Sequence, residues 1–207
     1  MPVINASTSG PGGIQMGGDA SGNLQLQSAG NTMSTISSSG MSINTYASAT
    51  SLITNGTGTP VSASGTSQTI ATGIPSWVKR ITVTFVGLQT NGTSSYNVQI
   101  GSGSMTTSGY TSSASYIAPS AAVQTSTVGF LFNINAGSSS LWNGQLIMSL
   151  HGSNQWVYTA IASDYSDDQV HYGAGRVTLS GALDRVGITT TAGSNSFNAG
   201  SVNILYE

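Results

Sequence analysis

Hydrophobic and polar residues alternate most regularly between residues 77 and 86 of the chain. The alternating positions are Ile81, Thr82, Val83, Thr84 and Phe85. A period of two is expected of a strand that packs one face on a core and leaves the other toward solvent. Pro75 fixes its own φ angle and favours an extended conformation at Ile74. The pattern therefore predicts a central strand over residues 77–86, entered from a corner at Pro75.

The rest of the C-terminal part shows short apolar runs separated by turn residues, at the spacing typical of a β-sandwich or barrel. Short turns at residues 152–154 and 180–182 are each predicted to close a hairpin, and Asn91-Gly92 is predicted to form a tight turn. No segment has a helical period of 3.6 residues. The predicted strands span residues 68–72, 77–86, 96–101, 114–118, 127–134, 144–151, 155–162, 175–180, 183–190 and 201–206.

Residues 1–59 have a different composition, dominated by Ser, Thr, Gly, Ala and Asn, with Asp19 as the only charged side chain. Their apolar residues come in pairs that bury too little area to offset the entropy of ordering the segment alone. These pairs are candidate assembly contacts: Ile14 and Met16, Leu24 and Leu26, Met41 and Ile43. The segment fits three structures: an arm wound with two other copies about a threefold axis, an arm fixed to a larger assembly, or a flexible Ser/Gly linker.

The sequence thus predicts an all-β chain with two parts. Residues 1–59 are expected to form an extended arm or a trimeric β stalk that anchors the protein. Residues 60–207, which hold every Trp and Phe, are expected to form a jelly-roll-like β-sandwich head.

Charge is scarce: 5% of the 207 residues are charged and the net charge is −2, against about 25% charged residues in an average soluble domain. A nucleic-acid-binding surface needs clustered Lys and Arg, so we expect no nucleic-acid partner. The first residues lack a basic and apolar leader, and no apolar run approaches membrane-spanning length, so we expect neither Sec export nor membrane insertion. An uncharged surface suits packing against copies of itself.

Three segments carry a family likeness. They are Gly-Ile-Pro-Ser-Trp-Val-Lys-Arg-Ile-Thr-Val at 73–83, Leu-Ser-Gly-Ala-Leu-Asp-Arg-Val-Gly-Ile-Thr-Thr at 179–190, and Phe-Asn-Ala-Gly-Ser-Val-Asn-Ile-Leu-Tyr-Glu at 197–207. Together they resemble a domain found in structural proteins of tailed bacteriophages and prophages, although Asn198 stands where many relatives carry an acidic residue. Gly-Asn-Leu-Gln-Leu-Gln-Ser at 22–28 resembles the start of phage fibre and appendage proteins. The resemblance implies a virion component and no particular ligand.

Enzyme signatures are absent from the sequence: there is no Gly-x-Ser-x-Gly elbow, no His-Glu-x-x-His and no phosphate-binding loop. His151 and His171 leave a Ser/His/Asp triad possible by count alone, while an exposed ring is the ordinary interpretation of His151. We expect no catalytic activity and no cofactor. The cluster at residues 164–168 could hold Ca²⁺, but its spacing is not that of a calcium loop, and a solvated loop is the favoured interpretation.

The segment from residue 164 to residue 172 combines carboxylates with aromatic rings, a mixture that binds sugars by hydrogen bonds and stacking. The candidate ligand residues are Asp164, Tyr165, Asp167, Asp168, His171 and Tyr172, with Trp142 and Trp156 beside them. The competing interpretation is that a Trp on a sandwich strand belongs to the core. Asp184 is expected either at the rim of the fold or buried and paired, with Arg176 as a possible partner.

Two functions fit these observations. The first is a homotrimeric fibre or appendage of the virion, whose arm binds other tail or capsid proteins and whose non-catalytic head binds host surface polysaccharide. The second is a capsid decoration protein with a purely structural role. A glycan depolymerase is a distant third, because such enzymes need paired carboxylates in a groove.

Overall fold

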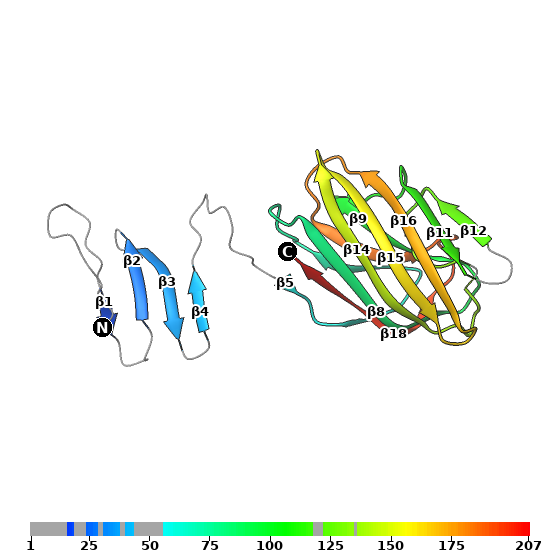
Figure 1. The fold of residues 1–207 in the computed structure, drawn as a ribbon, viewed down its shortest axis with the longest axis horizontal. Coiled ribbons are helices and arrows are strands. Elements are labelled where there is room, and N and C mark those ends of the chain that lie inside the picture. The colour runs from blue at the N-terminus through cyan, green and yellow to red at the C-terminus, as the bar shows by residue number, and fades with distance from the viewer. Residues whose placement is uncertain are drawn as a thin grey trace. The chain divides into compact units, whose positions relative to one another are not determined.

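We describe the chain from a computed structural model (Figure 1). The structure describes residues 16–18, 24–28, 31–37, 40–43, 56–117, 122–134 and 136–207. The chain divides into two compact units, Met1–Ile53 and Thr54–Glu207. Every regular element in the described ranges is a strand, which confirms the predicted all-β class.

The N-terminal unit contains one antiparallel sheet in the order β1-β2-β3-β4. Its strands are β1 (Met16–Gly18), β2 (Leu24–Ser28), β3 (Asn31–Ser37) and β4 (Gly40–Ile43). Apolar positions lie opposite apolar positions in the register: Met16 pairs with Leu26, Leu24 with Ile36, and Ile36 with Met41. Most of the predicted apolar pairs therefore fall on paired strands, while Ile14 lies outside the described residues.

The C-terminal unit is a two-layer β-sandwich. The larger sheet has nine strands and the smaller has five. The larger sheet runs in the order β12 (Ala122–Ser126), β11 (Thr111–Tyr116), β16 (Gln169–Thr178), β15 (Gln155–Asp164), β14 (Trp142–Gly152), β8 (Arg80–Thr90), β18 (Phe197–Tyr206) and β5 (Gly56–Thr57), with β6 (Val61–Ser62) also paired to β18. The smaller sheet runs in the order β10 (Ser104–Met105), β9 (Tyr96–Ser102), β17 (Arg185–Thr190) and β7 (Ser67–Thr72), with β13 (Phe130–Leu131) paired to β9.

Strand β8 is central to the larger sheet, where it pairs with β14 on one side and β18 on the other (Figure 1). Ile81, Val83 and Phe85 point into the core and are at most 1% exposed, so the predicted alternation is confirmed. The strand begins at Arg80 and not at Trp77, because a turn closed by the bond from Val78 N to Pro75 O precedes it.

The core lies between the two sheets and is rich in aromatic rings. Phe85 packs on Phe132 with ring centroids 4.5 Å apart, and Phe130 stacks on Tyr158 at 4.4 Å. Strand β17 returns beside β9 and strand β18 returns beside β8, so early strands pair with late ones in both sheets, as in a jelly roll. Strands β14, β15 and β16 form a meander within the larger sheet.

One predicted hairpin is confirmed and the other is wrong. Gly152, Ser153 and Asn154 connect the paired strands β14 and β15, with φ of 47° at Ser153 and 59° at Asn154. Two central residues with positive φ match the twist of antiparallel strands. Residues 180–182, by contrast, cross from β16 in the larger sheet to β17 in the smaller, because Leu179 and Leu183 are buried on either side of the crossing.

The single strand predicted over residues 127–134 is also wrong. Strand β12 ends at Ser126, and only Phe130–Leu131 pairs further on, with β9 of the other sheet. The segment passes from one layer to the other. Phe130, Phe132 and Ile134 are buried, as their alternation suggested, but the intervening Leu131 and Asn133 are buried too.

Candidate functional site

The acidic cluster at residues 164–168 forms the tip of the β15–β16 hairpin. Only residues 165–168 are a turn, and the rest of the predicted loop belongs to the two strands. The Asp164 carboxylate accepts a bond of 2.9 Å from Ser166 N, and Tyr165 N donates to Leu141 O at 3.2 Å. These bonds fix the tip, which presents the exposed side chains of Tyr165, Asp167 and Asp168.

Exposed apolar side chains gather on the outer face of the same part of the larger sheet and its flanking residues. We call this set the outer patch: Ile117, Val123, Leu141, Ile161, Tyr165, Val170 and Tyr172. Ile161 and Tyr172 lie directly opposite each other in the register of β15 and β16, and each leaves about half of its area to solvent. Exposed apolar residues clustered in this way mark an interaction surface.

Four of the predicted ligand residues lie in the interior instead. Asp164, His171, Trp142 and Trp156 are at most 3% exposed. The predicted contact of these side chains with a surface ligand is therefore corrected: they face the core because strand alternation turns them away from the side that carries Tyr172. For the two tryptophans, the competing core interpretation is the one that the structure shows.

His171 occupies a fully enclosed position. Ile134 N donates to His171 Nδ1 at 3.2 Å, and His171 Nε2 lies 3.1 Å from Gln169 Oε1. The ring stacks on Tyr116, with centroids 5.0 Å apart, and meets Trp142 edge-on at 4.6 Å. Burial lowers the pKa of His171 to about 4, a shift that the nearby Asp164 carboxylate only partly opposes.

Asp184 pairs with its neighbour Arg185 and not with Arg176. Arg185 Nε donates to Asp184 Oδ1 at 2.8 Å, and a second guanidinium nitrogen donates to Oδ2 at 3.0 Å. The backbone N–H of Gly103 adds a further bond. Hydrogen bonding from Arg185 lowers the pKa of Asp184. The pair is partly exposed and holds the start of β17 against the turn after β9, which is a structural role.

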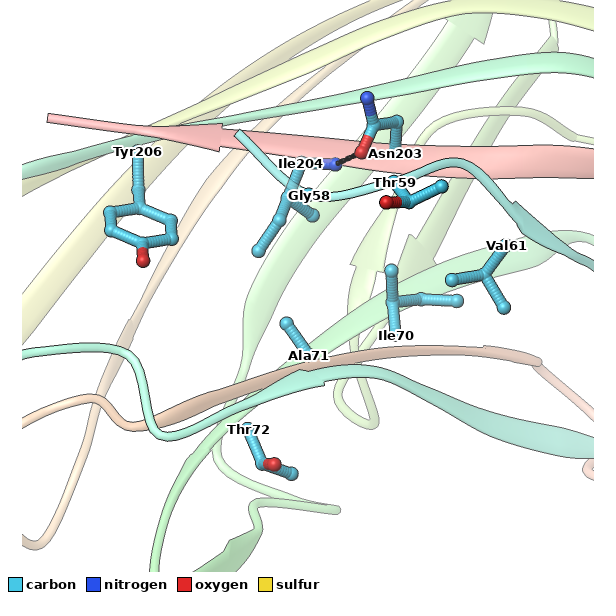
Figure 2. Close-up of a pocket in the computed structure, with 9 residues that line it drawn as sticks. All are labelled: Gly58, Thr59, Val61, Ile70, Ala71, Thr72, Asn203, Ile204 and Tyr206. Atoms are coloured by element: carbon cyan, nitrogen blue, oxygen red, sulfur yellow. Dashed lines mark hydrogen bonds between the residues drawn. The ribbon is translucent and has the colours of Figure 1, made fainter. Parts of the chain in front are cut away.

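A groove of about 350 Å³ opens at the edge of the sandwich between β18 and β7 (Figure 2). We call it the β7–β18 groove, and its walls include Thr59, Val61, Ile70, Ala71, Ile204 and Tyr206. Figure 2 shows Ile204 and Tyr206 projecting from β18 toward β7, and Ile70 and Ala71 projecting back toward β18. Ile70 is the extra residue of a bulge in the pairing of β7 with β17, which lets two consecutive side chains point the same way.

Trp77 lies beside this groove, and the sequence analysis did not include it among the candidate ligand residues. Its ring is 44% exposed and lies 6.0 Å from the ring of Tyr206, centroid to centroid. Trp77 shares the odd-numbered phase of the inward-facing Ile81, so a strand that began at residue 77 would have placed it in the core. The available signal was the Pro75-Ser76 pair, because a turn there breaks the phase before the strand begins.

Two classes of site were sought across the described ranges. No group of three or more His, Asp or Glu side chains there could hold a metal ion. None of the elements in those ranges is a helix with the length and hydropathy needed to span a membrane. Comparison with known proteins gave no match to a family model, to a curated protein or to a solved structure.

Proposed function

We propose that this chain is a structural protein of a bacteriophage virion, a fibre or appendage whose N-terminal unit anchors it and whose β-sandwich head makes a non-catalytic contact with host surface glycan. The proposal rests first on the resemblance of residues 73–83, 179–190 and 197–207 to phage structural proteins. A second support is the division into a charge-poor N-terminal unit and a head with its own core.

The observation that carries the contact role is the position of Tyr165 and Tyr172 with Asp167 and Asp168 at one end of the outer patch. Aromatic rings offer stacking faces and carboxylates accept hydrogen bonds from sugar hydroxyls. Tyr165, Asp167 and Asp168 are exposed on a tip whose backbone is fixed by internal hydrogen bonds, and Tyr172 is exposed on the adjoining strand β16. Binding would therefore cost little ordering entropy.

A non-catalytic head is supported by the state of its histidines. Both ring nitrogens of His171 are engaged inside the fold, so this ring is not free to act as a base. His151 is exposed near the β14–β15 hairpin, away from the acidic tip at the other end of β15.

Capsid decoration is the second candidate. In the N-terminal unit the described strands β1 to β4 pair with one another within one chain. A self-contained sheet suits an arm that clamps neighbouring capsid subunits.

The test uses a head variant with Asp167, Asp168 and Tyr172 changed to Ala, and Val86→Ala as a matched control, since Val86 is exposed on β8 outside the patch. The appendage proposal expects the triple variant to lose binding to host cells or purified surface polysaccharide at an unchanged melting temperature. Unchanged binding would remove this tip as the receptor site. A low-resolution virion map that places the chain on the shell would favour decoration.

A further inference from the structure

We infer that the β7–β18 groove and the neighbouring Trp77 form a binding site for a neutral oligosaccharide. This site is separate from the acidic tip. The inference is the same for a fibre or appendage and for a capsid decoration protein.

The first argument is the electrostatic character of the groove. None of its lining side chains is charged. Glu207, which follows Tyr206 directly, forms an ion pair of 3.1 Å with Arg80. An ionic ligand would find no counter-charge in the groove, so the geometry selects an uncharged one.

The second argument is the mixture of groups in the walls. Val61, Ile70 and Ile204 provide apolar surface, while the hydroxyls of Thr59 and Tyr206 make no hydrogen bond with any other described residue. A purely apolar ligand would leave these hydroxyls without water or a partner. A sugar presents both C–H faces and hydroxyls, and it can satisfy both kinds of wall.

The third argument is the aromatic end of the groove. Trp77 and Tyr206 lie with ring planes tilted by 53°, and the indole is 44% exposed. The other two tryptophans of the chain are at most 2% exposed. An exposed Trp beside a groove is a stacking platform, since a large ring kept in water gains free energy when a ligand covers it.

The bulge at Ile70 argues against the main competing occupant, an extended peptide that adds to the edge of β7. Bulged edges disrupt the regular row of backbone donors and acceptors that strand addition needs.

The experiment exploits the unequal exposure of the three tryptophans, because a ligand in the groove changes emission chiefly at Trp77. The full chain is titrated with maltohexaose, cellohexaose and a galactose-containing oligosaccharide, and each is repeated at about 0.1 M and about 1 M salt. We expect a saturable change with at least one of these sugars and an affinity that does not depend on salt.

Two variants probe the groove and one serves as the control. Tyr206→Ala and the groove-filling Ala71→Phe should each weaken that affinity by about tenfold or more, measured by calorimetry and at a melting temperature that shows a folded head. Val86→Ala, at an exposed position on β8 outside both the groove and the acidic tip, should leave it unchanged. The inference would be overturned if none of the three sugars changed the emission. It would also be overturned if both groove variants bound the sugar as tightly as the parent.

Discussion

The backbone N–H of Ile134 donates a hydrogen bond of 3.2 Å to Nδ1 of His171, which ties the segment after β13 to strand β16. Because Nδ1 is the acceptor, the ring carries its proton on Nε2, and that nitrogen donates to Gln169 Oε1. A second proton on Nδ1 would remove the acceptor and place a charge among Tyr116 and Trp142. The folded head therefore holds the neutral ring.

This arrangement predicts that the head loses stability in mild acid. The folded-state pKa of His171 is about 4, against an ordinary value of 6.5, so between these values the unfolded chain binds more protons than the folded one. Stability should be complete above pH 6.5 and fall as the pH is lowered toward 4. The contribution of this group is about 3 kcal/mol, measured as the difference in urea-unfolding free energy between pH 7 and pH 4.

Two variants isolate the effect from the titration of carboxylates. His171→Asn offers an amide oxygen in place of Nδ1 and does not titrate, so its pH dependence should be shallower than that of the parent by the same amount. His151→Gln, at an exposed ring, should keep the parent's full dependence. Identical slopes in the parent and in His171→Asn would contradict the assignment.

Phe85 is a second point where the cost of a change can be predicted. Its ring is 1% exposed and packs on Phe132 in the middle of the core. Phe85→Ala should cost roughly 3 to 5 kcal/mol, from lost transfer free energy plus the cavity left behind. The next residue supplies the control: Val86 is 65% exposed, and Val86→Ala should change stability by less than about 0.5 kcal/mol. Comparable losses for the two variants would show that the face assignment of β8 is wrong.

The hairpin between β14 and β15 should depend on backbone geometry at Asn154, whose φ is 59°. A β-branched side chain is strained in this left-handed conformation, so Asn154→Val should cost about 1 to 2 kcal/mol. Asn154→Gly should be neutral or slightly stabilising, because glycine reaches positive φ freely. Chemical denaturation of both variants measures this, and equal stability of the Val and Gly variants would count against the turn.

The sequence predicted most where one strand packs one face on the core. The period of two was enough to predict that Ile81, Val83 and Phe85 face the core. The turn residues at 152–154 were enough to predict the hairpin. The sequence analysis also offered the core as the alternative position for Trp142 and Trp156, because a Trp on a sandwich strand commonly packs inward.

What the sequence could not predict depends on contacts between distant segments. Residues 180–182 look like a hairpin locally, and only the assignment of β16 and β17 to different sheets makes them a crossing. The outer patch needs the register that places Ile161 opposite Tyr172. The β7–β18 groove needs a bulge at Ile70 and the approach of two sheet edges, and neither leaves a signal in a short stretch of sequence.

The final prediction concerns the oligomeric state. Apolar positions of the N-terminal sheet lie opposite one another, as with Leu24, Ile36 and Met41, and one small sheet needs a second surface to cover such residues. Three copies of the N-terminal unit packed about an axis would supply that surface, so light scattering on the full chain should give a trimer. A chain that begins at Thr54 keeps β5, which pairs with Leu205 and Tyr206, and it should be a folded monomer. Under the virion role proposed above, it should also fail to join particles. A full-length monomer with a protease-resistant N-terminal unit would exclude this assembly, and incorporation of the shortened chain into particles would place the anchor in the head.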